Sequence, residues 1–185
     1  MALVRPMLLR PAVEADHEAI VILANLAYRG GDGVKGWNAE SEHLEGERLN
    51  LALLKADLAT APDARLLLWC ETPDGPPLGT VWLEPEGGDS WHLGLLSVHP
   101  GYQDRKLGRS LLEAAEGFVR EQGGRRITMS VISVRDTLVA WYERRGYLPN
   151  GQTKPYPYGD DRWGRPLRDD LEFVELEKTI TIQAP

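Results

Sequence analysis

Leu93-Gly94-Leu95-Leu96-Ser97-Val98-His99-Pro100-Gly101-Tyr102-Gln103-Asp104-Arg105-Lys106-Leu107-Gly108-Arg109-Ser110-Leu111-Leu112 is the stretch that decides the fold. Its first part is a strand-like apolar run that ends at Val98, and its last part opens an amphipathic helix near Leu107. The turn between them offers free backbone N–H groups, and the helix adds the positive end of its dipole. Phosphate binds at such helix ends without any particular side chain.

The residues of this turn suit an anion. Gly108 lets a ligand approach the backbone closely, while Arg105, Lys106 and Arg109 add three positive charges. Spacing alone leaves two interpretations open: an anion site, above all for a pyrophosphate, and a plain strand-to-helix turn with a solvated basic face.

Downstream of the turn, the chain alternates helix and strand. The apolar period predicts a helix over Leu107–Glu121 that stops at Gly123-Gly124, and a strand over Ile127–Val134 follows. A strand, a crossover helix and a second strand form a right-handed unit with parallel strands. We expect a short helix over Asp136–Arg145, a strand opening at Tyr147, a loop over Pro149–Asp170 and a last strand over Leu171–Ile182.

Upstream, two helices precede a meander. The opening strand is expected over Leu3–Arg10, and helices over Glu14–Tyr28 and from about Leu44 to Ala59. The first helix would bury a stripe of Ala15, Ala19, Ile22, Leu23 and Leu26, and the second a stripe of Leu44, Leu51, Leu54 and Leu58. Short turns join the strand-like runs Arg65–Glu71, Leu78–Glu84 and Trp91–Val98 into an antiparallel meander.

These elements predict one α/β (α+β) domain over residues 1–185. Its mixed, mostly antiparallel sheet would have about seven strands, one parallel strand–helix–strand unit and helices on both faces. The single cysteine, Cys70, lies in an apolar run and is expected to be a buried core thiol. No metal site is predicted, because the sequence has no cysteine cluster.

Composition narrows the partners. A net charge of −7 disfavours general nucleic-acid binding through phosphates and suits a cationic small molecule or peptide. No apolar stretch reaches the ~20 residues that cross a bilayer, and the N-terminus lacks a signal-peptide core, so a cytoplasmic protein without membrane contact is expected.

The deciding stretch resembles the acetyl-coenzyme A signature of the GNAT superfamily of N-acetyltransferases. In that family a loop of the form Gln/Arg-x-x-Gly-x-Gly/Ala follows a strand that ends in Val-x-Pro. Matching residues here are Val98, Pro100, Gln103, Leu107 and Gly108. Lys106 stands where the family prefers its first glycine, which puts a Cβ beside the expected pyrophosphate path.

Two further segments carry the resemblance. Leu138–Tyr147 is similar to the family's Ala-x-x-Leu-Tyr-x-x-x-Gly-Phe, and Arg135 stands where an asparagine is common. The opening Arg10-Pro11-Ala12-x-x-x-Asp16 is similar to the family's first strand and helix start.

The resemblance implies acetyl-coenzyme A as co-substrate and an amine of a small molecule or peptide as acceptor, and it leaves a homodimer open. The pantetheine arm would pair with the strand edge, and the pyrophosphate would lie against the N–H groups of the turn. The cofactor-binding residues it implies are Leu96, Ser97, Val98, Gln103, Asp104, Arg105, Lys106, Leu107, Gly108, Arg109 and Arg135.

Tyr142 occupies the family's general-acid position. Acetyl transfer expels a thiolate, so a phenol near that sulfur can supply a proton. The alternative is that Tyr142 only packs or orders the sulfur.

His92 is the candidate base for the acceptor amine, because its ordinary pKa of ~6.5 suits accepting a proton. It would otherwise be a surface histidine, and Glu84 on the preceding strand is a rival. His99 is expected to be structural, and His17 and His43 solvated.

The segment Lys154–Pro166 is long for a loop between strands. Tyr156, Tyr158 and Trp163, with Asp160 and Asp161, would either receive a cation or form an aromatic flap held against the core, and we favour the flap. The loop around Trp37 would form the other wall of an acceptor site.

Two other functions compete with an acetyltransferase. The lysine in the signature turn allows a non-catalytic acyl-coenzyme A binding or regulatory module. An unrelated nucleotide-binding domain is disfavoured, because the Walker and dinucleotide glycine patterns are absent from the sequence.

Overall fold

The computed structural model of the chain describes residues 7–31 and 39–181. Within these ranges the main helices are α1 (His17–Arg29), α2 (Leu51–Thr60), α3 (Leu107–Glu121) and α4 (Asp136–Glu143). The strands are β1 (Leu8–Pro11), β2 (Leu44–Glu45), β3 (Arg65–Cys70), β4 (Gly79–Gly87), β5 (Ser90–Val98), β6 (Arg126–Ile132), β7 (Leu148–Pro155), β8 (Arg165–Pro166) and β9 (Glu172–Thr179).

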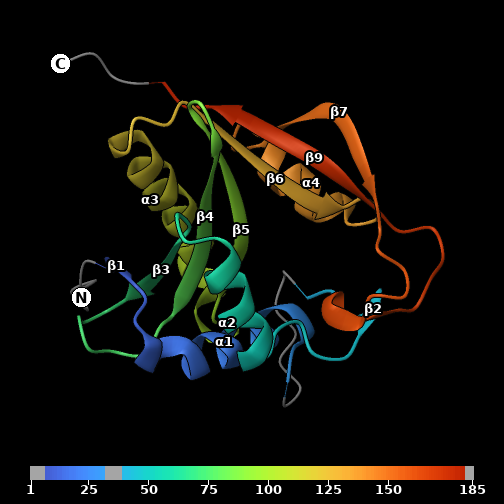
Figure 1. Cartoon of the computed structure of the whole chain (residues 1–185), viewed down its shortest axis with the longest axis horizontal. Helices are drawn as coiled ribbons and strands as arrows, with labels where there is room; N and C mark the ends of the chain where they lie inside the picture. Colours follow the sequence, from blue (N-terminus) through green and yellow to red (C-terminus); the bar gives the residue numbers. More distant parts are fainter. Residues whose placement is uncertain (1–6, 32–38, 182–185) are drawn as a thin grey trace.

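Seven strands form one sheet in the order β1-β3-β4-β5-β6-β9-β7 (Figure 1). Every neighbouring pair is antiparallel except β5 and β6, which flank the crossover helix α3. The predicted mixed sheet with a single parallel strand–helix–strand unit is therefore confirmed.

The sheet divides at its parallel pair. β5 and β6 pair only from Ser90↔Arg126 to His92↔Thr128, although both strands continue beyond these residues. Figure 1 shows the consequence: β3, β4 and β5 diverge from β6, β9 and β7 after meeting at one end. The two strands therefore splay apart, and beyond His92 this edge of β5 has no strand partner among the described residues.

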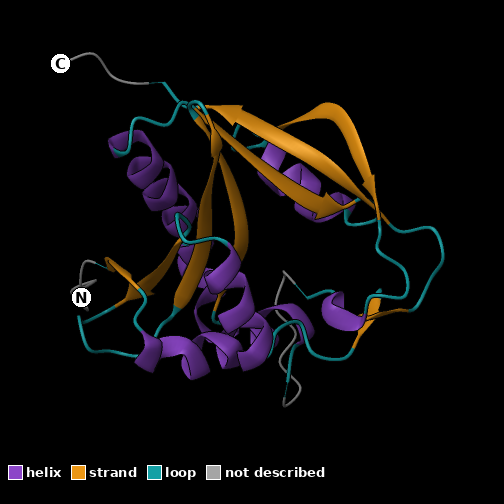
Figure 2. Cartoon of the chain, viewed as in Figure 1, coloured by secondary structure: helices purple, strands orange, loops and turns teal. Residues whose placement is uncertain are grey.

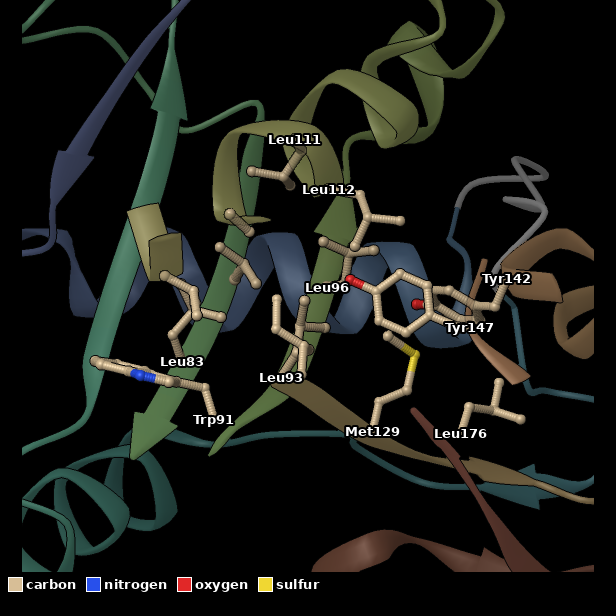
Figure 3. Packing of buried hydrophobic residues seen from close by; sticks show 14 of the residues in the cluster. Leu83, Trp91, Leu93, Leu96, Leu111, Leu112, Met129, Tyr142, Tyr147 and Leu176 are labelled. Carbon is tan, nitrogen blue, oxygen red and sulfur yellow. The ribbon is translucent and has the colours of Figure 1, made fainter. Parts of the chain in front are cut away.

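Helices cover both faces of the sheet, as predicted (Figure 2). On one face, α3 and α4 contribute Leu111, Leu112 and Leu138 to a large core that also holds Tyr142 and Tyr147 (Figure 3). On the other face, α1 and α2 bury Ile20 and Leu54 against β3, in a cluster that includes the fully buried Cys70.

The second helix is shorter than predicted. It begins at Leu51, where the Asn50 side chain accepts a hydrogen bond from the Leu53 N–H as an N-cap. Leu44 lies instead in β2, which pairs antiparallel with β8, 120 residues further along the chain. A tertiary pairing of such distant residues overrides the local helical period that includes Leu44.

The first helix is present, but its buried stripe differs from the prediction. Ile20, Leu23, Ala24 and Ala27 are buried, whereas Ile22 is 67% exposed. Both stripes have helical spacing in an apolar segment, so periodicity alone does not select the buried one.

The predicted loop over Pro149–Asp170 is wrong at its start, where the structure has β7, and at the short strand β8. Residues 148–155 form β7, which pairs with β9 across a register shift between Pro149 and Thr153. Gly151, with a φ of 83°, lies within that irregularity. Part of the predicted first strand, residues 3–6, lies outside the described residues, and β1 begins at Leu8.

Candidate active site

A bulge in β5 opens the site. Thr80 pairs with Ser97 and Trp82 pairs with Gly94, so β5 has one residue more than β4 between these pairs. Leu95, inside the bulge, has a φ of 50°, which is rare for a side chain other than glycine. A non-glycine residue in this conformation costs stability and marks a functional constraint in many proteins.

A cavity of about 320 Å³ lies where β5 and β6 separate. Leu93, Gly94, Leu95 and Leu96 of β5 form one wall, and Met129–Ile132 of β6 form another. The remaining lining residues are Tyr28, Glu40, Leu44, Arg48, His92, Arg135, Leu138, Tyr142, Lys154, Tyr156, Trp163 and Phe173.

Tyr142 reaches this cavity from α4. Its side chain is buried, with ring centroids 5.0 Å from Trp141 and 5.9 Å from Tyr147, both edge to face. Figure 3 shows Tyr142 and Tyr147 together, on the side of the core away from Trp91. Burial, and to a lesser degree Tyr28, raises the pKa of Tyr142, which keeps its hydroxyl protonated at any physiological pH.

His92 lies at the last paired position of β5, on the rim of the same cavity. Its Nδ1 lies 3.4 Å from the Thr128 hydroxyl and 3.8 Å from a Glu86 carboxylate oxygen, and that hydroxyl donates to Glu86 at 2.8 Å. Burial lowers the pKa of His92, and Glu86 opposes this shift. The imidazole is about one-third exposed and is neutral at pH 7, as a base must be.

A second cavity of about 280 Å³ lies on the α2 side of β5. Glu84, the rival base, lines it beside His92, its register partner on the neighbouring strand. One Glu84 carboxylate oxygen accepts a hydrogen bond from the Trp82 indole at 3.0 Å. Arg48, His92, Gly94, Leu95 and Trp163 line both cavities, so the two meet at the β5 bulge.

The predicted anion turn lies at the N-terminus of α3. Residues 100–105 form a short 3-10 helix, and Lys106 joins it to α3 with φ 61° and ψ 18°, the left-handed conformation. This is the conformation that glycine adopts without strain, which explains why a glycine suits the position. The Lys106 side chain is exposed, whereas Leu107 and Gly108 are buried. The side chains of Gln103, Asp104 and Arg105 lie outside the described part of the structure.

The Lys106→Gly variant should therefore be more stable than the Lys106→Ala variant. Both variants remove the same charge, but only glycine relieves the left-handed strain, by about 1 kcal/mol. Urea denaturation of Lys106→Gly and Lys106→Ala measures the difference. Equal midpoints for the two variants would show that the turn is not strained.

Arg135, predicted to bind the cofactor, is buried rather than facing solvent. It occupies the N-cap position of α4 without a side-chain capping bond. Its guanidinium lies 3.4 Å from Glu40, which also pairs with Arg29 at 2.8 Å. Leu96 lines the first cavity with Arg135, whereas Ser97 and Val98 pair with β4 and are buried. His92, Leu96, Arg135 and Tyr142 are thus brought together, while Lys106–Arg109 lie outside this lining.

The segment 154–166 forms the favoured aromatic flap. Tyr156 is 3% exposed, donates to the Gly164 carbonyl at 3.1 Å and stacks on Phe173 at 5.7 Å. Figure 2 shows how the loops around it cross from the end of β7 toward the β2–β8 pair. Tyr158 and Asp160 are exposed; the Asp161 side chain and Trp37 lie outside the described residues.

Sequence reasoning missed four lining residues of importance: Tyr28, Glu40, Arg48 and Lys154. Only Lys154 belongs to a segment that the sequence analysis had singled out, the aromatic segment Lys154–Pro166. Among the other histidines, His99 accepts a hydrogen bond from the Gly101 N–H, as expected of a structural residue. His17 and His43 are half-buried rather than fully solvated.

Two negative findings hold for residues 7–31 and 39–181. No group of three or more histidine, cysteine or acidic side chains there is arranged to hold a metal ion. None of the helices described there combines the length and apolarity that a membrane crossing requires.

Comparison with known proteins agrees with this geometry. The acetyltransferase (GNAT) family profile matches residues 32–147. A mycothiol acetyltransferase from Beutenbergia cavernae is 33% identical over 85 residues, which are 45% of this chain and 29% of that protein. The match therefore spans less than a third of that relative's length.

Solved structures share the fold. Ard1 from Thermoplasma volcanium superposes with a TM-score of 0.67 at 15% identity, covering 95% of this chain and 99% of that one. The ribosomal-protein-S18-alanine N-acetyltransferase of Escherichia coli has a TM-score of 0.65 at 16% identity, with 97% of each chain covered.

Proposed function

Because the chain belongs to the GNAT family of acetyltransferases, we propose that it is an N-acetyltransferase that moves an acetyl group from acetyl-coenzyme A to a primary amine. The observation that carries the proposal is the cavity between the separated ends of β5 and β6, with Tyr142 in its wall and His92 on its rim. One edge of β5 there offers backbone groups to an extended arm, and the N–H groups at the start of α3 offer an anion site.

Two residues carry the proton transfers of the reaction, His92 as the base and Tyr142 as the acid. His92 takes the first proton from the acceptor ammonium, whose ordinary pKa of ~10.4 keeps it charged at neutral pH. The nitrogen then attacks the thioester carbonyl carbon, and the C–S bond breaks as that carbon regains its double bond. The nitrogen loses a second proton, Tyr142 donates its own to the departing sulfur, and one proton in total leaves to water.

The raised pKa of Tyr142 shapes its contribution. A phenol that resists ionisation is a hydrogen-bond donor to developing negative charge on sulfur well before it gives up the proton. The donor therefore stabilises the thiolate late, as the C–S bond breaks, and does not titrate within the working pH range.

A thiol-release assay with acetyl-coenzyme A across an amine panel tests the proposal. Release of coenzyme A thiol that depends on an added amine, with the N-acetylated product identified by mass, is the expected result. Tight coenzyme binding without turnover of any amine would favour the alternative, a non-catalytic acyl-coenzyme A binding module, which the lysine in the signature turn motivates.

The pH dependence tests the base. Because the pKa of His92 is lowered from its ordinary value of ~6.5, the imidazole is still mostly neutral at that pH and gains its proton only at a lower pH. With one acceptor, kcat/KM should fall about tenfold per pH unit below the His92 pKa, in addition to any limb set by the amine itself. His92→Gln should lose that acid limb. A limb unchanged in His92→Gln but lost in Glu84→Gln would transfer the role to Glu84.

A further inference from the structure

The two meeting cavities hold an unusual arginine. The Arg48 guanidinium lies over two aromatic rings, 5.1 Å from the Tyr28 centroid and 5.0 Å from the Trp163 centroid. No carboxylate within residues 7–31 and 39–181 forms an ion pair with it, and its side chain is half-buried. Contacts with two aromatic rings restrict a guanidinium without using its N–H groups as hydrogen-bond donors, so these stay available to a planar anion.

Each of the other cations that line the cavities has a carboxylate partner, although Arg135 shares Glu40 with Arg29. Arg135 pairs with Glu40, Lys154 with Glu175 at 3.3 Å, and Arg162 with Asp57. Arg48 is thus the lining cation that forms no ion pair with a carboxylate of the described residues. A half-buried charge of this kind gains most from a ligand that carries the opposite charge.

A complementary negative group lines the same second cavity. Glu84 accepts a hydrogen bond from the Trp82 indole and lies across the strand pair from His92. A carboxylate beside a neutral imidazole suits an incoming ammonium, since one attracts the charge and the other takes the proton. The cavity therefore presents an unbalanced positive group and an available negative group to one small ligand.

The remaining wall of the second cavity is apolar. Leu53 and Leu54 of α2 and the Trp82 ring of β4 line it. An apolar side chain is the occupant that such a wall favours.

We propose that the acceptor is a free α-amino acid with an apolar side chain, whose carboxylate binds Arg48 and whose amine lies at Glu84 and His92. This inference rests on the proposed function and narrows its acceptor. It also revises the expectation from net charge, because a purely cationic amine would leave Arg48 unbalanced.

Matched acceptors test it through the thiol-release assay. Leucine, leucinamide and isopentylamine share an apolar body and an amine, but only leucine carries a carboxylate. The wild-type protein should prefer leucine, and Arg48→Gln should lower kcat/KM for leucine by about 10- to 100-fold, mainly through KM, with little change for leucinamide. For each acceptor, the ratio of kcat/KM in the wild type to kcat/KM in Arg48→Gln is compared, because this ratio does not depend on the pKa of the acceptor's amine.

Arg165→Gln is the matched control, since Arg165 is an exposed arginine paired with Glu45 outside both cavities. It should leave the preference for leucine unchanged. Equal losses for leucine and leucinamide in Arg48→Gln would overturn the proposal, as would a wild-type enzyme that prefers isopentylamine.

A binding measurement separates this inference from the proposed function. Calorimetric titration of the coenzyme A-loaded protein with N-acetylleucine and with its amide needs no turnover. The proposal is supported, even if no amine is acetylated, when N-acetylleucine binds at least tenfold more tightly than its amide and Arg48→Gln abolishes this preference. Equal affinity for the two compounds, or none for either, overturns it whatever the turnover assay shows.

Discussion

Replacing Tyr142 with phenylalanine is expected to lower kcat about 100-fold while leaving the affinity for coenzyme A near that of the wild type. The change removes one oxygen from a ring that stays packed against Trp141 and Tyr147. A positioned proton donor contributes about 10²- to 10⁴-fold to a transfer step. Single-turnover release of thiol measures the effect on chemistry, and calorimetry measures the coenzyme affinity.

Tyr147→Phe is the matched control for Tyr142→Phe. It removes a buried hydroxyl from the adjacent ring, but that hydroxyl donates to Glu116 at 3.0 Å and not into the cavity. We expect this variant to lose about 1 kcal/mol of stability and to keep its kcat. A wild-type kcat in Tyr142→Phe would show that the tyrosine only packs, which is the alternative that the sequence left open.

Replacing Glu116 with glutamine is expected to lower the free energy of unfolding by about 2–3 kcal/mol. Glu116 is a buried residue of α3, 8% exposed, that accepts from the Tyr147 hydroxyl and pairs with Lys178 of β9 at 2.7 Å. The Lys178 ammonium also lies 5.3 Å from the Tyr147 ring centroid. The variant leaves a largely buried cation without its carboxylate. Thermal unfolding should shift by about 4–12 °C for a chain of this length.

Glu113→Gln provides the control on the same helix. Glu113 pairs with Arg109 at 2.8 Å, but both side chains are more than half exposed, so the pair is worth about 0.5 kcal/mol at most. Losses of the same size in Glu113→Gln and Glu116→Gln would show that the Glu116 network does not hold α3 against β9.

The central part of the fold was predictable because local signals agree there. The apolar alternation of β5, the helical period of α3 and the glycine that follows it indicate one strand–helix–strand unit, and only a parallel crossover satisfies that order. The bounds of α3, Leu107–Glu121, were predicted as the structure has them.

The site was predictable only in part, because its chemistry is assembled from distant segments. Tyr142 lies in a helix with a family motif and was found, but Arg48 precedes α2 in a segment that the sequence assigned to the helix itself. Its neighbours Tyr28 and Trp163 come from the end of α1 and from the flap, and no local pattern relates them. The left-handed conformation of Lys106 likewise depends on how the 3-10 turn meets α3.

A crystal structure of the protein with coenzyme A tests the central claim most directly. The account predicts diphosphate oxygens within hydrogen-bond distance of the N–H groups of Leu107, Gly108 and Arg109, with the sulfur between β5 and β6 beside the Tyr142 hydroxyl. A diphosphate bound away from α3, or a sulfur in the second cavity on the α2 side of β5, would contradict it.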